Sequence, residues 1–199
     1  MKIRKTILLI WLSILFTAIG LVFWRTEFLY GLPTPIPENY QVVKQGSVIL
    51  IPGIPQPKDN KPVFLHFFNP TCPCSKFNIT HFKALVKQYG DDVTFAIVVM
   101  SNTRFTARQI QDKFDVNIPV YFDTAIARSC GVYSTPQAVI LDNHQKLYYR
   151  GNYNRSRYCT DEKSNYARQA LEALLHDRVV IFNQFALKAY GCSLPNCSK

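Results

Sequence analysis

Residues 63–76 of this 199-residue chain read VFLHFFNPTCPCSK. The continuous apolar run 63–68 is typical of a buried strand, and apolar side chains at helical spacing over 75–89 predict a helix behind it. Cys72 and Cys74 therefore lie where a strand passes into a helix. The positive end of a helix dipole lowers the pKa of a nearby thiol and raises its thiolate fraction, so we expect the chemistry of the chain at this pair.

Strand and helix patterns alternate after this motif. Apolar and β-branched runs predict strands at 93–100, 120–122, 137–141 and 146–150. Periodic or capped segments predict helices at 106–114, 124–129, 161–175 and 178–190. The turn Asp142-Asn143-His144 predicts that the last two strands form a hairpin. This order indicates an α/β domain with a mixed sheet and helices on both faces.

The N-terminal segment has the composition of a membrane span. Residues 6–24 carry no charge and are rich in Leu, Ile, Phe and Val. About 20 such residues cross a bilayer, and the basic residues before them predict a cytoplasmic N-terminus. The run ends without a small-residue cleavage pattern, which favours a retained anchor over a cleaved signal peptide. We expect a single-pass protein of the cytoplasmic (inner) membrane, N-in, with its C-terminal domain in the periplasm.

Charge and cysteine content narrow the class of protein further. The net charge is +10, of which +4 falls in residues 1–25, and the rest contains no long basic run, so we expect no nucleic-acid partner. All six cysteines follow the apolar segment, on the side where disulfides persist. The expected segments are a cytoplasmic stub and transmembrane anchor (1–25), a Pro-rich spacer with a possible edge strand at 48–51 (26–61), the α/β domain (62–177), and a C-terminal helix with a cysteine-containing tail (178–199).

Three segments carry a resemblance to a known family. They are the Phe-Phe-Asn-Pro-Thr-Cys of 67–72, the Gly-Val-Tyr-Ser-Thr-Pro-Gln of 131–137, and Leu141-Asp142 followed by Tyr149-Arg150-Gly151. With them the chain, over roughly residues 45–176, resembles the thioredoxin superfamily in its TlpA/ResA-like or AhpC/TSA-type redoxin branch. The resemblance implies a thioredoxin-like three-layer α/β/α fold with a mixed central sheet, and a cis Pro136 that faces the active thiol.

The active loop of this chain departs from the family's Cys-x-x-Cys pattern. Its spacing is an atypical Cys-Pro-Cys, with Ser75 at the usual second-cysteine position and Thr71 where the family commonly has Trp. The resemblance implies that Thr135 and Pro136 present backbone groups to a substrate strand beside the thiols. It also places Thr71 and Pro73 in the loop that positions the substrate.

The cysteine pair predicts thiol–disulfide exchange on proteins. Cys72 would attack a substrate disulfide, and Cys74 would resolve the mixed disulfide. Such a protein needs a cysteine-containing client and a redox partner in the same membrane, and it needs no cofactor.

Two alternative functions use the same residues. Paired thiolates suit Cu(I), as in copper-delivery modules of SCO-like type, and oxidation of Cys72 to a sulfenic acid would make the chain a thiol peroxidase-like redoxin.

The region after the predicted hairpin adds further candidate residues. In the fold that the resemblance implies, this region lies near Cys72, so Arg155 and Arg157 would stabilise a thiolate or bind an anionic substrate. The alternative is that both arginines are solvated. Cys159 is expected in a structural disulfide with Cys192 or Cys197, and a local bridge between Cys192 and Cys197 is the simpler option.

Cys130 and His66 have two interpretations each. Cys130, six residues before Pro136, is either a third thiol of the active loop or a small buried side chain, and the second is favoured. His66 lies in an apolar strand run, where a hydrogen-bonded core histidine is favoured over a metal ligand.

Overall fold

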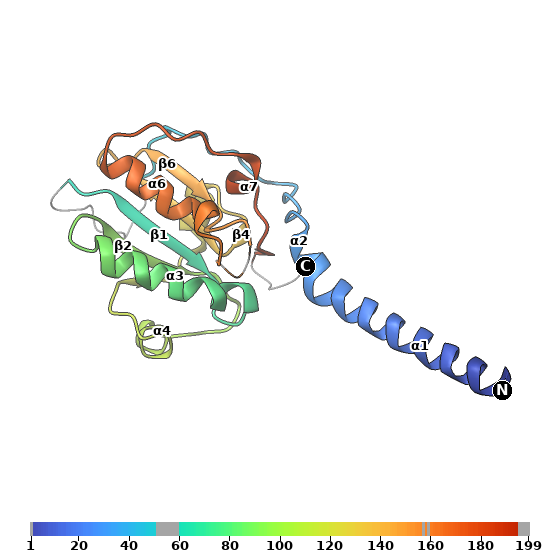
Figure 1. The fold of residues 1–199 in the computed structure, drawn as a ribbon. Helices are drawn as coiled ribbons and strands as arrows, with labels where there is room; N and C mark the ends of the chain where they lie inside the picture. The colour runs from blue at the N-terminus through green and yellow to red at the C-terminus, as the bar shows by residue number, and fades with distance from the viewer. Residues whose placement is uncertain (1, 51–59, 157, 159, 195–199) are drawn as a thin grey trace. The chain divides into compact units, whose positions relative to one another are not determined.

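The computed structural model describes residues 2–50, 60–156, 158 and 160–194, in two units that meet between Pro33 and Thr34 (Figure 1). The first unit is helical from Lys2 to Gly31. It consists of α1 (Lys2–Phe23), the π-helical turn η1 (Trp24–Phe28) and α2 (Leu29–Gly31).

This N-terminal helix is long and apolar enough to cross a membrane. The 29 residues Ile3–Gly31 contain no buried residue in their most apolar stretch. At 1.5 Å per residue they span about 43 Å, more than the roughly 30 Å hydrocarbon core of a bilayer. The segment is therefore a candidate transmembrane helix.

The second unit is built on a five-stranded sheet in the order β3-β2-β1-β5-β6. Strands β1 (Val63–Phe68), β2 (Thr94–Val99) and β3 (Val120–Tyr121) are parallel. Strand β5 (Gln137–Leu141) runs antiparallel to β1, and β6 (Leu147–Gly151) runs antiparallel to β5. A mixed sheet of this order with helices on both faces is a thioredoxin-like α/β fold, which confirms the predicted class.

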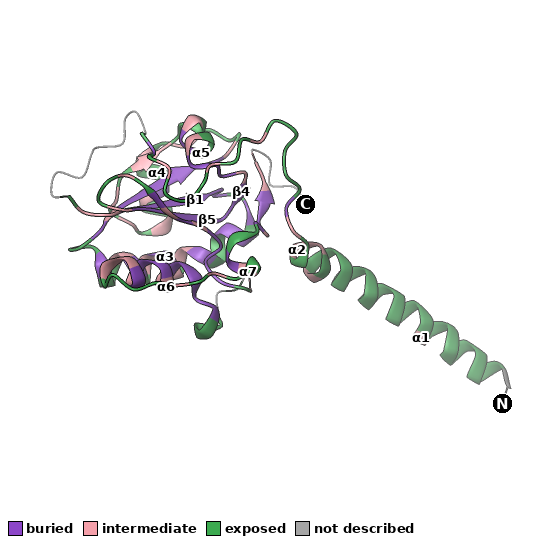
Figure 2. Ribbon diagram, turned by 90° about the horizontal axis from the view of Figure 1, so that it is seen from above, coloured by how far each residue is buried: buried purple, intermediate pink, exposed green. Residues whose placement is uncertain are grey.

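The central strand β1 is buried on both faces, as its continuous apolar run predicts. Phe64 belongs to the core formed with α3 (Pro73–Tyr89) and α6 (Tyr166–Leu175). Its neighbour Leu65 points the other way, into the core formed with α5 (Thr124–Cys130). Figure 2 shows α3 and α6 on one side of the sheet and α5 on the other, so the chain forms three layers.

Local sequence accounts for where the helices begin. Pro73 occupies the first turn of α3, where a backbone N–H has no hydrogen-bond partner within the helix, so the missing N–H of proline costs nothing. Thr106 and Gln109 form a reciprocal capping box that starts α4 (Ala107–Phe114) at the predicted residue. The Asp123 side chain accepts a hydrogen bond from the Ala125 N–H and starts α5.

A second, two-stranded sheet joins distant parts of the chain. Strand β4 (Ser134–Thr135) pairs antiparallel with β7 (Cys192–Ser193). The Thr135–Pro136 peptide bond that follows β4 is cis, as the resemblance implies. This small sheet brings the C-terminal segment to the loop that precedes β5.

The C-terminal segment is fastened to the end of β6 before it reaches β7. The Asn152 amide donates hydrogen bonds to the carbonyls of Phe185 and Lys188, and its backbone N–H donates to Ala186. A Cβ at Gly151 would collide with the Ala186 carbonyl, so only glycine allows this approach. These contacts fix the path of the segment around α7 (Gln184–Leu187).

The predicted helix 178–190 is wrong in extent. The structure has only the four residues of α7 there, capped by Asn183, whose side chain accepts from the Phe185 and Ala186 N–H groups. The side chains of Val179 and Ile181 are 93% and 94% exposed. Apolar residues at helical spacing therefore do not form a packed helix here, because the chain extends past α6 before Asn183 turns it.

Two other predicted elements begin or end differently. The helix expected over 161–175 is divided: Asp161 caps a short 3-10 turn at Glu162–Ser164, and Asn165 then caps α6. The edge strand expected at 48–51 is reduced to a single bridge between Val48 and Lys146, and residue 51 lies outside the described residues.

A pair of alanine substitutions tests the difference between the buried helix α6 and the exposed segment after it. Leu171→Ala removes a side chain with no exposure and is expected to lower the free energy of unfolding by about 2–5 kcal/mol. Ile181→Ala, at an almost fully exposed side chain, is expected to change it by less than about 0.5 kcal/mol. Urea unfolding of the full chain in detergent measures both changes in the free energy of unfolding. An equal loss of stability in Ile181→Ala and Leu171→Ala would contradict the exposed position of the segment after α6.

Candidate functional site

The first part of the site is the loop between β1 and α3. Cys72 has an extended backbone and stands as the N-cap of α3. Its N–H donates to the Asn69 carbonyl at 3.0 Å, and the Asn69 N–H donates to Ser75 Oγ at 3.1 Å. Ser75 is fully buried and serves as the hydrogen-bond acceptor that closes this loop.

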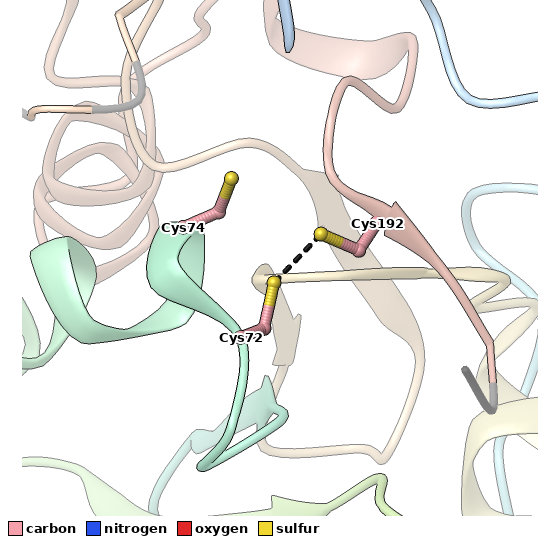
Figure 3. A group of neighbouring side chains, drawn as sticks. All are labelled: Cys72, Cys74 and Cys192. Carbon is pink, nitrogen blue, oxygen red and sulfur yellow. Dashed lines mark hydrogen bonds between the residues drawn. The ribbon is translucent and has the colours of Figure 1, made fainter. Parts of the chain in front are cut away.

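The second part of the site comes from the far end of the chain. In the β4–β7 pair, Thr135 lies opposite Cys192. The Cys192 side chain points at Cys72, with the two Sγ atoms 2.6 Å apart (Figure 3). Either sulfur can be the donor in this contact. The two thiols are thus close enough to form a disulfide after a small side-chain movement.

Cys74 completes a group of three sulfurs. It lies in the first turn of α3, and its Sγ faces the same space as those of Cys72 and Cys192 (Figure 3). The three Sγ atoms all lie within 4.8 Å of one another. All three side chains are buried, with Cys72 and Cys192 at 0% exposure.

Burial and neighbouring thiols control the protonation of Cys192. Hydrogen bonds with Cys72 and Cys74, followed by desolvation, hold the pKa of the Cys192 thiol well above its ordinary value. Cys192 therefore keeps its proton at neutral pH and can donate it toward the neighbouring sulfur.

Cys130 is separate from this group. It ends α5, is fully buried in the core on the opposite side of the sheet, and has its pKa raised to about 12 by desolvation. The favoured interpretation of Cys130 as a small core residue fits this placement, because the side chain is both inaccessible and protonated.

Polar contacts of Thr34 hold the segment that leads into β7 in position. The Thr34 hydroxyl donates to the Gly191 carbonyl at 2.7 Å and lies 3.0 Å from Ser134 Oγ. The Thr34 N–H donates to the Ala189 carbonyl at 2.8 Å. A Cβ at Gly191 would collide with the Thr135 carbonyl oxygen, so the close approach of the two strands depends on this glycine.

The structure also describes Thr71, which was expected in the substrate loop, and one of the two arginines that were expected near the thiolate. Thr71 is exposed, and both its N–H and its hydroxyl donate to Asn69 Oδ1. The Arg155 guanidinium lies over the ring of Phe185, 4.7 Å from its centroid. Arg157, Cys159 and Cys197 lie outside the described residues, so the predictions made for them stay predictions.

His66 is a core residue. Its ring is fully buried and stacks on Phe68 and Phe82, and Nδ1 lies 2.6 Å from the hydroxyl of Tyr153. Desolvation, with a smaller contribution from His81, lowers the pKa of His66 to about 3. The ring is therefore neutral at physiological pH, and it is not a member of the three-sulfur group.

One family description matches most of the chain. Residues 47–195 match the family described as "Domain of unknown function (DUF6436)". The chain belongs to this family. No curated protein matches it.

Solved structures share its fold at low sequence identity. A hypothetical protein from Sinorhizobium meliloti 1021 has a TM-score of 0.57 and 17% identity, over 69% of this chain and 80% of its own. An uncharacterized conserved protein from Geobacillus kaustophilus has a TM-score of 0.55 and 19% identity, over 75% and 92%. A thioredoxin family thiol:disulfide interchange protein from Chlorobium tepidum TLS has a TM-score of 0.46 and 18% identity, over 58% and 81%. At these identities the likeness of the first two structures concerns the fold alone.

An apolar groove adjoins the β4–β7 pair. It has a volume of about 490 Å³, and its lining includes Tyr40, Met100, Val132, Tyr133 and Leu194. Tyr133 immediately precedes β4, and Leu194 immediately follows β7. The groove therefore continues from the edge of the sheet at which Cys192 meets Cys72.

The sequence analysis missed Cys192 as a member of the site. It assigned this residue to a structural disulfide in the tail, whereas the structure places its sulfur against Cys72. The two residues are 120 positions apart, and no local pattern links them. Gly191, directly before Cys192, was the available signal, since glycine beside a cysteine permits a close backbone approach.

Proposed function

We propose that this chain is a membrane-anchored thiol–disulfide oxidoreductase that acts on protein thiols outside the cytoplasm. The observation that carries the proposal is the 2.6 Å contact between the sulfurs of Cys72 and Cys192 at the N-terminus of α3, with Cys74 in the same cluster. A thiol at a helix N-terminus is stabilised as the thiolate, the nucleophile of disulfide exchange.

Cys72 is the attacking residue in this proposal. Its thiolate attacks one sulfur of a client disulfide, a mixed disulfide forms, and the other client sulfur leaves as a thiolate that takes up a proton. A second thiol of the cluster then attacks the Cys72 sulfur and releases the client's remaining thiolate. Two electrons pass from the protein thiols to the client disulfide, and the reverse sequence oxidises a client dithiol.

The N-terminal helix supports the location. The span Ile3–Gly31 would hold the domain at the surface of the cytoplasmic membrane, and the basic residues before it favour a cytoplasmic N-terminus. The domain would then lie in the periplasm, an oxidising compartment where protein disulfides are formed and exchanged. Its partners would be a cysteine-containing client and a second redox protein of the same membrane.

A redox titration of the full chain in detergent tests this function. In glutathione and dithiothreitol buffers, one pair of thiols is expected to oxidise together, with a midpoint between about −120 and −270 mV, the range of known exchange proteins. Counting thiols after acid quenching measures the transition. Cys72→Ser is expected to eliminate it, and Cys130→Ala, which removes a core thiol outside the cluster, is expected to keep it. A transition that survives Cys72→Ser would contradict the proposal.

The three sulfurs favour a second candidate function, the binding of Cu(I). Soft thiolate ligands select Cu(I), and the Sγ atoms of Cys72, Cys74 and Cys192 are all within 4.8 Å of one another in a buried position. These three residues would hold the ion, which adds Cys192 to the ligand pair expected from the sequence.

Anaerobic titration with Cu(I) against a competing chelator tests this second function. One equivalent is expected to bind to the reduced chain, and Cys74→Ser and Cys192→Ser are each expected to weaken binding at least about tenfold, since each removes one thiolate ligand. Cys130→Ala is the matched control. Binding that is unchanged by both serine variants would exclude a site at this cluster.

A further inference from the structure

The attacking thiol of the proposed reaction is covered. Cys72 has no exposed surface, so an external disulfide cannot reach its sulfur in this conformation. The residue whose sulfur lies against it is Cys192 of β7, itself fully buried. A movement of the segment that carries Cys192 would remove this cover from Cys72.

That segment has the arrangement expected of a bound client. An extended peptide can be recognised by adding a strand to the free edge of a sheet, where backbone hydrogen bonds fix its register. Strand β7 is added in this way to β4, antiparallel, with Cys192 opposite Thr135 and next to the cis Pro136. The register brings the Cys192 sulfur to Cys72, which is where a client's sulfur must arrive.

We propose that β7 occupies the place of a client strand on β4 and that Cys192 is the internal disulfide partner of Cys72. This inference rests on the proposed exchange function and names its second thiol and the chemistry of its client. Release of β7 exposes Cys72 and the edge of β4, and return of β7 brings Cys192 back to resolve the mixed disulfide.

In the redox step, the client disulfide is the oxidant and accepts two electrons from the protein thiols. After Cys72 and a client disulfide have formed a mixed disulfide, the returning Cys192 thiol gives up its proton, and its sulfur attacks the Cys72 sulfur. The bond between Cys72 and the client breaks, the Cys72–Cys192 bond forms, and the client leaves as a thiolate that takes up a proton. The client disulfide is reduced to two thiols, and the two protein thiols are oxidised to one disulfide.

The contacts of β7 also indicate which residues a client would have on either side of its cysteine. Gly191, before the cysteine, lies too close to the Thr135 carbonyl for a Cβ, and Leu194, two residues after it, lines the apolar groove. A client that replaces β7 would be an extended segment with a small residue before its cysteine and an apolar residue two positions after it.

The strand is held by contacts that a variant can remove without altering a thiol. Gly191→Val places side-chain atoms against the Thr135 carbonyl and should displace β7 from β4. Thr34→Val removes the hydroxyl that donates to Gly191 and keeps the shape of the side chain. The first variant acts by collision and the second by loss of a hydrogen bond, so the same result from both cannot come from one local defect.

Site-resolved alkylation of the reduced full chain in detergent tests the proposal. With iodoacetamide and mass-spectrometric identification of each cysteine, Gly191→Val is expected to alkylate Cys72 at least about tenfold faster than the wild type, and Thr34→Val is expected to act in the same direction by a smaller factor. Cys130 is the internal control, since it lies in the core and should stay slow in every folded variant. Equal Cys72 rates in all three proteins, with Cys130 slow, would overturn the proposal.

The same samples separate this inference from the proposed function. Faster alkylation of Cys72 without any two-electron redox transition would support the covering strand and reject the exchange function. A normal redox transition with unchanged alkylation would keep the exchange function and reject the covering strand. The disulfide-linked dimer of a peptide with the sequence of residues 188–194 is expected to form a mixed disulfide with Cys72 in Gly191→Val, with release of one peptide thiol. It should react faster than the dimer of the same peptide with Val in place of its glycine, and equal rates would contradict the client chemistry.

Discussion

The pairing of β7 with β4 is the interaction on which the candidate site depends. It places Cys192 opposite Thr135 and brings its sulfur to within 2.6 Å of Cys72, although the two cysteines are 120 residues apart in the chain. The pairing itself depends on Gly191, whose missing side chain allows the backbones to approach, and on the Thr34 hydroxyl. A site made from the two ends of the domain follows from this short ladder.

This arrangement also accounts for the unusual spacing of the first two cysteines. Ser75 stands where a second thiol is expected, and its hydroxyl is used to accept a hydrogen bond from the Asn69 N–H and close the loop. In the proposed reaction, Cys192 of β7 is the disulfide partner of Cys72 instead. Cys74 remains beside the pair, in the first turn of α3, which is why the cluster has three sulfurs and a donor set that also suits Cu(I).

Much of the fold could be predicted from the sequence because its signals are local. The buried run at β1, the capping box at Thr106 and the hairpin between β5 and β6 are each specified within a few residues. The position of Cys72 at the start of α3 follows from the same signals.

The rest depended on contacts that no local pattern contains. Strand β7 has two residues and no periodicity, so neither its existence nor its partner could be inferred from sequence. Val179 and Ile181 belong to a run of residues with the spacing of an apolar helix face, yet they are exposed, because the chain extends past α6 before Asn183 caps α7. The position of the Cys192 sulfur beside Cys72 could not be inferred for the same reason.

Disulfide mapping of the oxidised full chain tests the central claim most directly. The chain is oxidised with glutathione disulfide, its remaining thiols are blocked in acid, and its peptides are fragmented by mass spectrometry so that Cys72 and Cys74 are distinguished. The account predicts a bond between Cys72 and Cys192, with Cys74 recovered as a blocked thiol. A bond between Cys72 and Cys74, or a bond between Cys192 and Cys197 with Cys72 left reduced, would contradict it.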